Sequence, residues 1–91
     1  MEGCCSVFST LIESAGKRGF SVVGHMILGR NCFVFQSRNR DFEDKERMHF
    51  VVQQVIQYCP FCGVELQELI LRNENSFEEF KQECVEYLHD F

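Results

Sequence analysis

Two cysteines that lie two residues apart constrain this chain more than any other feature. They belong to the segment Cys59-Pro60-Phe61-Cys62-Gly63, which directly follows an apolar run typical of a β-strand. The C-x-x-C spacing lets both sulfur atoms point at one tetrahedral metal ion, and it also occurs in redox-active dithiols. The rest of the sequence therefore has to decide between a metal site and a thiol pair that carries out redox chemistry.

The chain is long enough for one small domain and not for two. It has 91 residues, of which 45% are hydrophobic and ten are Phe, so we expect a packed core. Domains only slightly smaller than this usually need a disulfide or a metal ion to be stable. No run approaches the ~20 apolar residues of a membrane span, and the N-terminus lacks the basic and apolar regions of a signal peptide. We therefore expect a cytoplasmic protein that has no contact with membranes.

Hydrophobic periodicity predicts an α+β fold. A helix is expected over residues 4–15, followed by strands over 20–28, 32–38 and 48–58 that form a three-stranded antiparallel sheet. Gly29-Arg30-Asn31 is the predicted hairpin turn, and the pair Gln53-Gln54 indicates a bulge or an exposed edge in the third strand. The predicted core consists of Phe8, Leu11, Phe33, Phe35, Val52, Ile56, Phe77 and Phe80.

The C-terminal part of the chain predicts an amphipathic helix. Ser76 and Glu79 have the spacing of a capping box, so the helix is expected to begin at Ser76, after a short strand or helical turn over 64–71. One face of this helix carries an apolar stripe made of Phe77, Phe80, Cys84, Leu88 and Phe91. The opposite face of the helix is acidic.

The sequence after the C-x-x-C favours the metal interpretation. A thioredoxin-like fold forms most of its sheet after the dithiol, whereas only 29 residues follow Cys62, and it needs a second proline besides Pro60. Gly63 is typical of a zinc knuckle, since the turn brings backbone N–H groups towards the sulfur atoms and a side chain would crowd it. The alternative stays open: a thiol oxidoreductase with Cys59 as the nucleophile and Cys62 as the resolving thiol.

A structural zinc ion needs four ligands, nearly all of them Cys or His. Cys4 and Cys5 are the best further pair, because backbone N–H groups and the helix dipole stabilise thiolates at the start of a helix. The fourth ligand stays open between Cys5, Cys32 and His25. We predict a structural Zn²⁺ site formed by Cys4, Cys5, Cys59 and Cys62.

The order of these motifs resembles that of small uncharacterised zinc-knuckle proteins. They share an N-terminal Cys-Cys pair, an amphipathic helix, two or three strands and a terminal C-P-aromatic-C-G motif, which here corresponds to residues 4–66. The resemblance implies a zinc-binding protein without an assigned activity. The acidic segment 72–91 departs from this pattern. We interpret residues 1–91 as one zinc-stapled domain, with a core over 1–71 and an acidic C-terminal helix over 72–91.

Charge and motif content narrow the function classes. The net charge is −5, and residues 51–91 carry two basic and eight acidic side chains, so nucleic acid is an unfavourable partner. The chain contains no His-Glu-x-x-His, phosphate loop or Gly-x-Ser-x-Gly motif. We therefore predict a non-enzymatic zinc-binding module that contacts a protein partner, or a second copy of itself, through its C-terminal helix.

Overall fold

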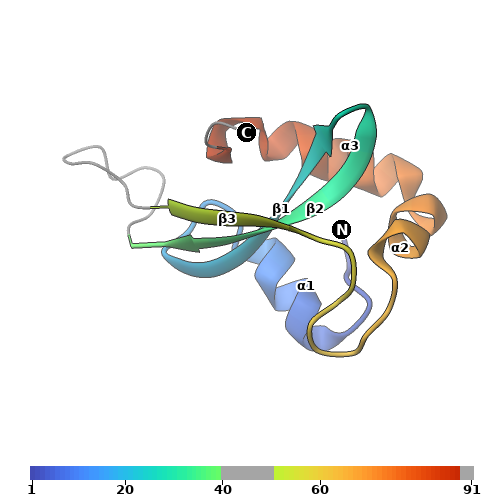
Figure 1. Cartoon of the computed structure of the whole chain (residues 1–91), viewed down its shortest axis with the longest axis horizontal. Coiled ribbons are helices and arrows are strands. Elements are labelled where there is room, and N and C mark those ends of the chain that lie inside the picture. Colours follow the sequence, from blue (N-terminus) through green and yellow to red (C-terminus); the bar gives the residue numbers. More distant parts are fainter. Residues whose placement is uncertain (40–50, 89–91) are drawn as a thin grey trace.

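The computed structural model describes residues 1–39 and 51–88 and confirms the predicted α+β architecture (Figure 1). The three strands form one antiparallel sheet in the order β1-β2-β3, so β3 lies at an edge. Within the described residues, no helix is both long enough and apolar enough to cross a membrane. The elements are α1 Ser6–Glu13, β1 Gly19–Ile27, β2 Arg30–Arg38, β3 Val51–Ile56, α2 Leu66–Arg72, α3 Glu74–Glu83 and the short 3-10 helix η1 Val85–Tyr87.

The hairpin between β1 and β2 turns one residue earlier than predicted. Ile27 pairs with Arg30, so the loop consists of Leu28 and Gly29 alone. Both have positive φ angles, 52° and 78°, as a two-residue hairpin turn with the twist of its strands requires. As a result, β2 begins at Arg30 and is two residues longer than expected.

The third strand continues this sheet in an unbroken register. It pairs with β2 from Phe33 opposite Ile56 to Arg38 opposite Val51. The glutamines Gln53 and Gln54 stay in that register, which confirms the edge interpretation and not the bulge. The predicted first residues of this strand, 48–50, lie outside the described part of the chain.

The core is centred on Phe33. Its ring meets Phe8 of α1 and Phe77 of α3 edge-on, each with centroids 5.2 Å apart, and Phe80 lies 6.3 Å away. Edge-to-face pairs of this kind add about 0.5–1.5 kcal/mol to the burial of the rings. One side chain of β2 therefore joins the first and the last long helices.

Seven of the eight predicted core residues lie in the core or pack against it, and one prediction is wrong. Val52 is 53% exposed and lies on the edge strand β3. The predicted core also omitted two residues of the hairpin, Val22 and Val23, which are both fully buried. Since neighbouring side chains of a strand point to opposite faces, this part of the sheet is covered on both sides.

The C-terminal part contains two α-helices, and the first of them corresponds to the helical turn, not the strand, that was predicted over 64–71. The segment over 64–71 forms most of α2, and the chain breaks at Asn73 before α3 begins at Glu74. The predicted capping box is wrong, since Ser76 lies inside α3 and the Phe77 N–H donates to the Asn73 carbonyl, 2.8 Å away. Of the apolar stripe, Phe77, Phe80 and Cys84 are buried in the core, Leu88 is half-buried, and Phe91 lies outside the described residues.

A buried polar network fastens the end of the chain to the sheet. The Gln36 side-chain amide donates to Gln53 at 2.6 Å and to the Tyr87 carbonyl at 2.8 Å. The Arg38 guanidinium donates to the same carbonyl and to Gln36. Buried polar groups are tolerated when they are hydrogen-bonded in this way, so the network positions η1 against β2.

Gly16 offers a direct test of this packing. It follows the end of α1 with a φ of +80°, and a Cβ atom there would lie 2.6 Å from the Tyr87 ring. Gly29 has nearly the same φ, +78°, with open space around it. We expect Gly29→Ala to cost about 1 kcal/mol of backbone strain and Gly16→Ala about 1–3 kcal/mol more. Urea unfolding of both variants measures the difference, and equal losses would show that Tyr87 moves aside freely.

Candidate metal centre

A tight turn after β3 presents two of the predicted ligands. The segment over residues 59–63, here called the knuckle, is closed by hydrogen bonds from the Cys59 N–H to the Val64 carbonyl (2.9 Å) and from the Gly63 N–H to the Cys59 carbonyl (3.0 Å). Gly63 has a φ of +80°, a conformation that residues other than glycine rarely adopt. The predicted crowding is wrong, because a Cβ atom at this position would meet open space. The Phe61 N–H points at Cys59 Sγ, 3.5 Å away, as expected for a turn that supports a thiolate.

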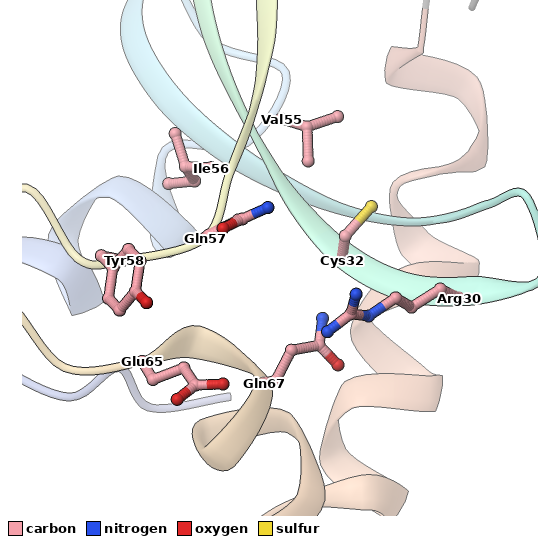
Figure 2. A pocket seen from close by; sticks show the side chains of 8 residues that line it. All are labelled: Arg30, Cys32, Val55, Ile56, Gln57, Tyr58, Glu65 and Gln67. Carbon is pink, nitrogen blue, oxygen red and sulfur yellow. The ribbon is translucent and has the colours of Figure 1, made fainter.

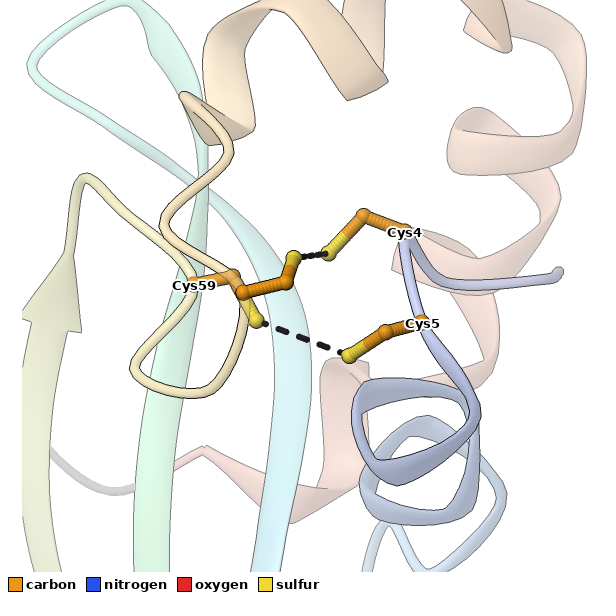
Figure 3. A group of neighbouring side chains, drawn as sticks. Cys4, Cys5 and Cys59 are labelled. Carbon is orange, nitrogen blue, oxygen red and sulfur yellow. Dashed lines mark hydrogen bonds between the residues drawn. The ribbon is translucent and has the colours of Figure 1, made fainter.

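The other two cysteines immediately precede α1. The helix begins at Ser6 and not at Cys4 as predicted, and Cys5 is its extended N-cap residue, with a φ of −151° and a ψ of 169°. This irregular backbone lets two neighbouring side chains reach the same place (Figure 3). Ser9 was not predicted to contribute, but its hydroxyl accepts the Gly3 N–H at 2.8 Å and so helps to fix this segment.

The fold brings the four cysteine sulfur atoms together, and we call them the four-sulfur cluster. The Sγ atoms of Cys4, Cys5, Cys59 and Cys62 all lie within 4.8 Å of one another. Cys5 and Cys59 are 3.8 Å apart (Figure 3), and Cys4 and Cys62 are 3.3 Å apart. Zinc–sulfur bonds of about 2.3 Å in a tetrahedron place the sulfur atoms about 3.8 Å apart. The four sulfur atoms could therefore hold one tetrahedral metal ion.

The pKa values of two thiols in the cluster shift in opposite directions. Burial raises the pKa of Cys59, but the backbone N–H groups of Cys62 and Phe61, together with the neighbouring thiols, outweigh it and lower this pKa to about 7. Burial raises the pKa of Cys4 far above its usual range, and hydrogen bonds to Cys62 and Cys59 raise it further. Four thiolates in one place repel one another, so a divalent cation is the natural partner that lets them all ionise.

The other two candidates for the fourth ligand, Cys32 and His25, lie outside the four-sulfur cluster, and so does the remaining cysteine, Cys84. Cys32 is buried in β2, where its thiol points to the His25 carbonyl at 3.5 Å, and it lines a pocket that also holds Arg30 and Gln67 (Figure 2). His25 pairs with Cys32 across the hairpin. Cys84 is fully buried in the core, and burial raises its pKa to about 11. None of these three belongs to the group of possible metal ligands found in the described part of the chain.

Known proteins add nothing to this geometry. A scan against protein-family models finds no match, and neither curated proteins nor solved structures match the chain. The function is therefore inferred from the sequence and the structure of the chain itself.

Proposed function

We propose that this chain is a zinc-binding domain in which Cys4, Cys5, Cys59 and Cys62 hold one structural zinc ion. The observation that carries the proposal is the convergence of the four sulfur atoms within 4.8 Å. A tetrahedral set of four thiolates suits zinc, which binds such ligands in closed structural sites. The ion would fasten the start of α1 to the end of β3, and the order of motifs over 4–66 supports kinship with small zinc-knuckle proteins.

The same ligand set supports a non-enzymatic role. Catalytic zinc keeps one position open for water or substrate, whereas here four protein ligands would occupy all four positions. The oxidoreductase alternative needs Cys59 to attack a disulfide in solution. Cys59 is only 2% exposed and packs within the core, whereas Cys62 is exposed. This difference in exposure favours a metal ligand over a nucleophile at position 59.

A protein remains the best candidate for the partner of this domain. The apolar stripe of α3 packs on the sheet, so self-association through it would require Phe77 and Phe80 to leave the core. The exposed side of α3 is acidic and includes Glu74, Glu79 and Glu83. Such a surface repels phosphate groups and suits a basic protein surface.

The metal content of the purified chain tests the proposal. Native mass spectrometry should find one zinc ion per chain, and absorption spectroscopy should find no colour, because zinc is colourless and iron is not. Cys59→Ser and Cys62→Ser should each lower the zinc content well below one. Cys32→Ala and Cys84→Ala are the matched controls, because they remove cysteines outside the four-sulfur cluster and should leave one zinc ion bound.

The result that would contradict the proposal is equally direct. A folded chain that binds no zinc, and in which Cys59 and Cys62 change between thiol and disulfide, would make the oxidoreductase the better description. Loss of zinc in the control variants to the same extent as in the cluster variants would show that the ion binds elsewhere.

A further inference from the structure

The four cysteine residues of the cluster differ sharply in their exposure. Cys62 is exposed at the tip of the knuckle, Cys4 and Cys5 are half-buried, and Cys59 is buried. Zinc-bound thiolates remain nucleophilic, and their reaction with oxidants depends on exposure. Cys59 is further protected because its sulfur accepts the Phe61 N–H. A soluble oxidant therefore meets Cys62 first.

The sulfur nearest to Cys62 determines the product of an attack. Cys4 Sγ lies 3.3 Å from Cys62 Sγ, closer than the 3.8 Å between the sulfur atoms of Cys5 and Cys59. Cys4 also lies before the regular part of α1, so its side chain can follow the small shift that a disulfide requires. This geometry makes Cys4, from the segment before α1, the resolving thiol for Cys62.

We propose that Cys62 is an oxidation site, at which a peroxide converts the zinc centre into a Cys4–Cys62 disulfide and releases the ion. This inference rests on the proposed function, since it assumes that the cluster holds zinc. It differs from the dithiol predicted for the C-x-x-C segment, because Cys59 takes no part in it.

The chemistry balances with a peroxide as the only oxidant. The Cys62 thiolate attacks one peroxide oxygen, the O–O bond breaks, and sulfenic acid and hydroxide form. The Cys4 thiolate then attacks the Cys62 sulfur, the S–S bond forms, and a second hydroxide leaves. Two electrons pass from the two sulfur atoms to the peroxide, and both hydroxides take up protons to give water. Zinc stays Zn²⁺ and dissociates, since only Cys5 and Cys59 remain to bind it.

The product keeps the connection that the metal provided. A Cys4–Cys62 disulfide joins the segment before α1 to the knuckle, which are the same two places that the zinc ion would join. Oxidation should therefore release the metal while most of the fold persists. A Cys59–Cys62 disulfide would have the opposite effect, because it would leave the N-terminal segment unattached.

The test uses the full zinc-loaded chain and hydrogen peroxide. Zinc is counted before peroxide is added, and its release is then followed with the chromogenic chelator 4-(2-pyridylazo)resorcinol. Free thiols are alkylated and the protein is digested with trypsin. Cys4 and Cys5 fall in the peptide 1–17, and Cys59 and Cys62 fall in the peptide 48–72. A cross-linked pair of these peptides, assigned to Cys4 and Cys62 by fragmentation, is the expected product, with one zinc ion released per disulfide.

Two histidine variants separate the roles of the two residues, because histidine is also a zinc ligand. Cys62→His should release zinc at least about tenfold more slowly than the unchanged protein, since the exposed thiolate is gone. Cys4→His should still form sulfenic acid at Cys62, which dimedone traps, but no Cys4–Cys62 link can form. Cys84→Ala is the control and should behave like the unchanged protein.

Each other outcome overturns the inference. A Cys59–Cys62 or Cys5–Cys59 disulfide as the first product, or unchanged zinc release in Cys62→His, would show that the attack begins elsewhere. Zinc that stays bound with all four thiols reduced would show that the centre resists peroxide. A chain that holds no zinc before peroxide is added would overturn the proposed function as well, and the initial zinc count distinguishes this case from the others.

Discussion

Removal of the metal ion is expected to abolish the cooperative fold of this protein. Structural zinc couples about 10 kcal/mol or more of binding free energy to folding, and small domains are stable by only about 5–15 kcal/mol. Cys59 belongs both to the four-sulfur cluster and to the hydrophobic core, so the loss of the ion reaches the core directly. Chelation with EDTA should therefore remove the near-UV circular dichroism of the aromatic side chains, and excess zinc should restore it.

The control for this experiment is a sample in which zinc exceeds the chelator. The same EDTA concentration with zinc in molar excess should leave the spectrum unchanged, which excludes a direct effect of the chelator. An unchanged spectrum after complete removal of zinc would show that the hydrophobic core is sufficient for folding. In that case the ion would only position the N-terminal segment.

The second large effect is expected from Phe33→Ala. Phe33 is fully buried and touches the rings of Phe8, Phe77 and Phe80, so its removal leaves a cavity where three elements meet. Truncation of a buried Phe costs about 3–5 kcal/mol. Urea unfolding at saturating zinc measures this loss, because the ligand concentration then contributes equally to both proteins.

Phe20 provides a matched control for this substitution. It stacks on Phe35 with ring centroids 5.5 Å apart, but it is 64% exposed. Phe20→Ala should therefore cost about 1 kcal/mol or less, since the ring loses little buried area. Equal losses for the two variants would show that the core is not centred on Phe33.

The fold was largely predictable because its signals are local. The two strands of the hairpin are short runs rich in Val, Ile and Phe on either side of a glycine, and such patterns depend on a few neighbouring residues. The errors arose where distant packing decides. Val52 looks like a core residue in its own strand, but its exposure depends on which strand forms the edge. The break at Asn73 similarly depends on how α2 and α3 each pack on the sheet.

The candidate site likewise has one part that the local sequence predicts and one part that depends on the whole fold. The knuckle is a local motif, and its glycine was found correctly, although Gly63 is needed for its positive φ angle and not for the predicted lack of space. That Cys4 and Cys5 reach it depends on the whole sheet folding between them. A choice between Cys5, Cys32 and His25 was out of reach from the sequence alone, because each lies in a different element. The structure places only Cys5 beside the other three sulfur atoms.

The two halves of the cluster are made at different times. Cys5 and Cys59 are 54 residues apart and Cys4 and Cys62 are 58 residues apart. At synthesis rates of about 5–20 residues per second, the N-terminal pair waits about 3–12 seconds for its partners. During this time the adjacent thiols of Cys4 and Cys5 are accessible to oxidants and to other metal ions. Translation speed therefore sets how long the Cys4-Cys5 pair depends on the reducing capacity of its surroundings before the cluster can form.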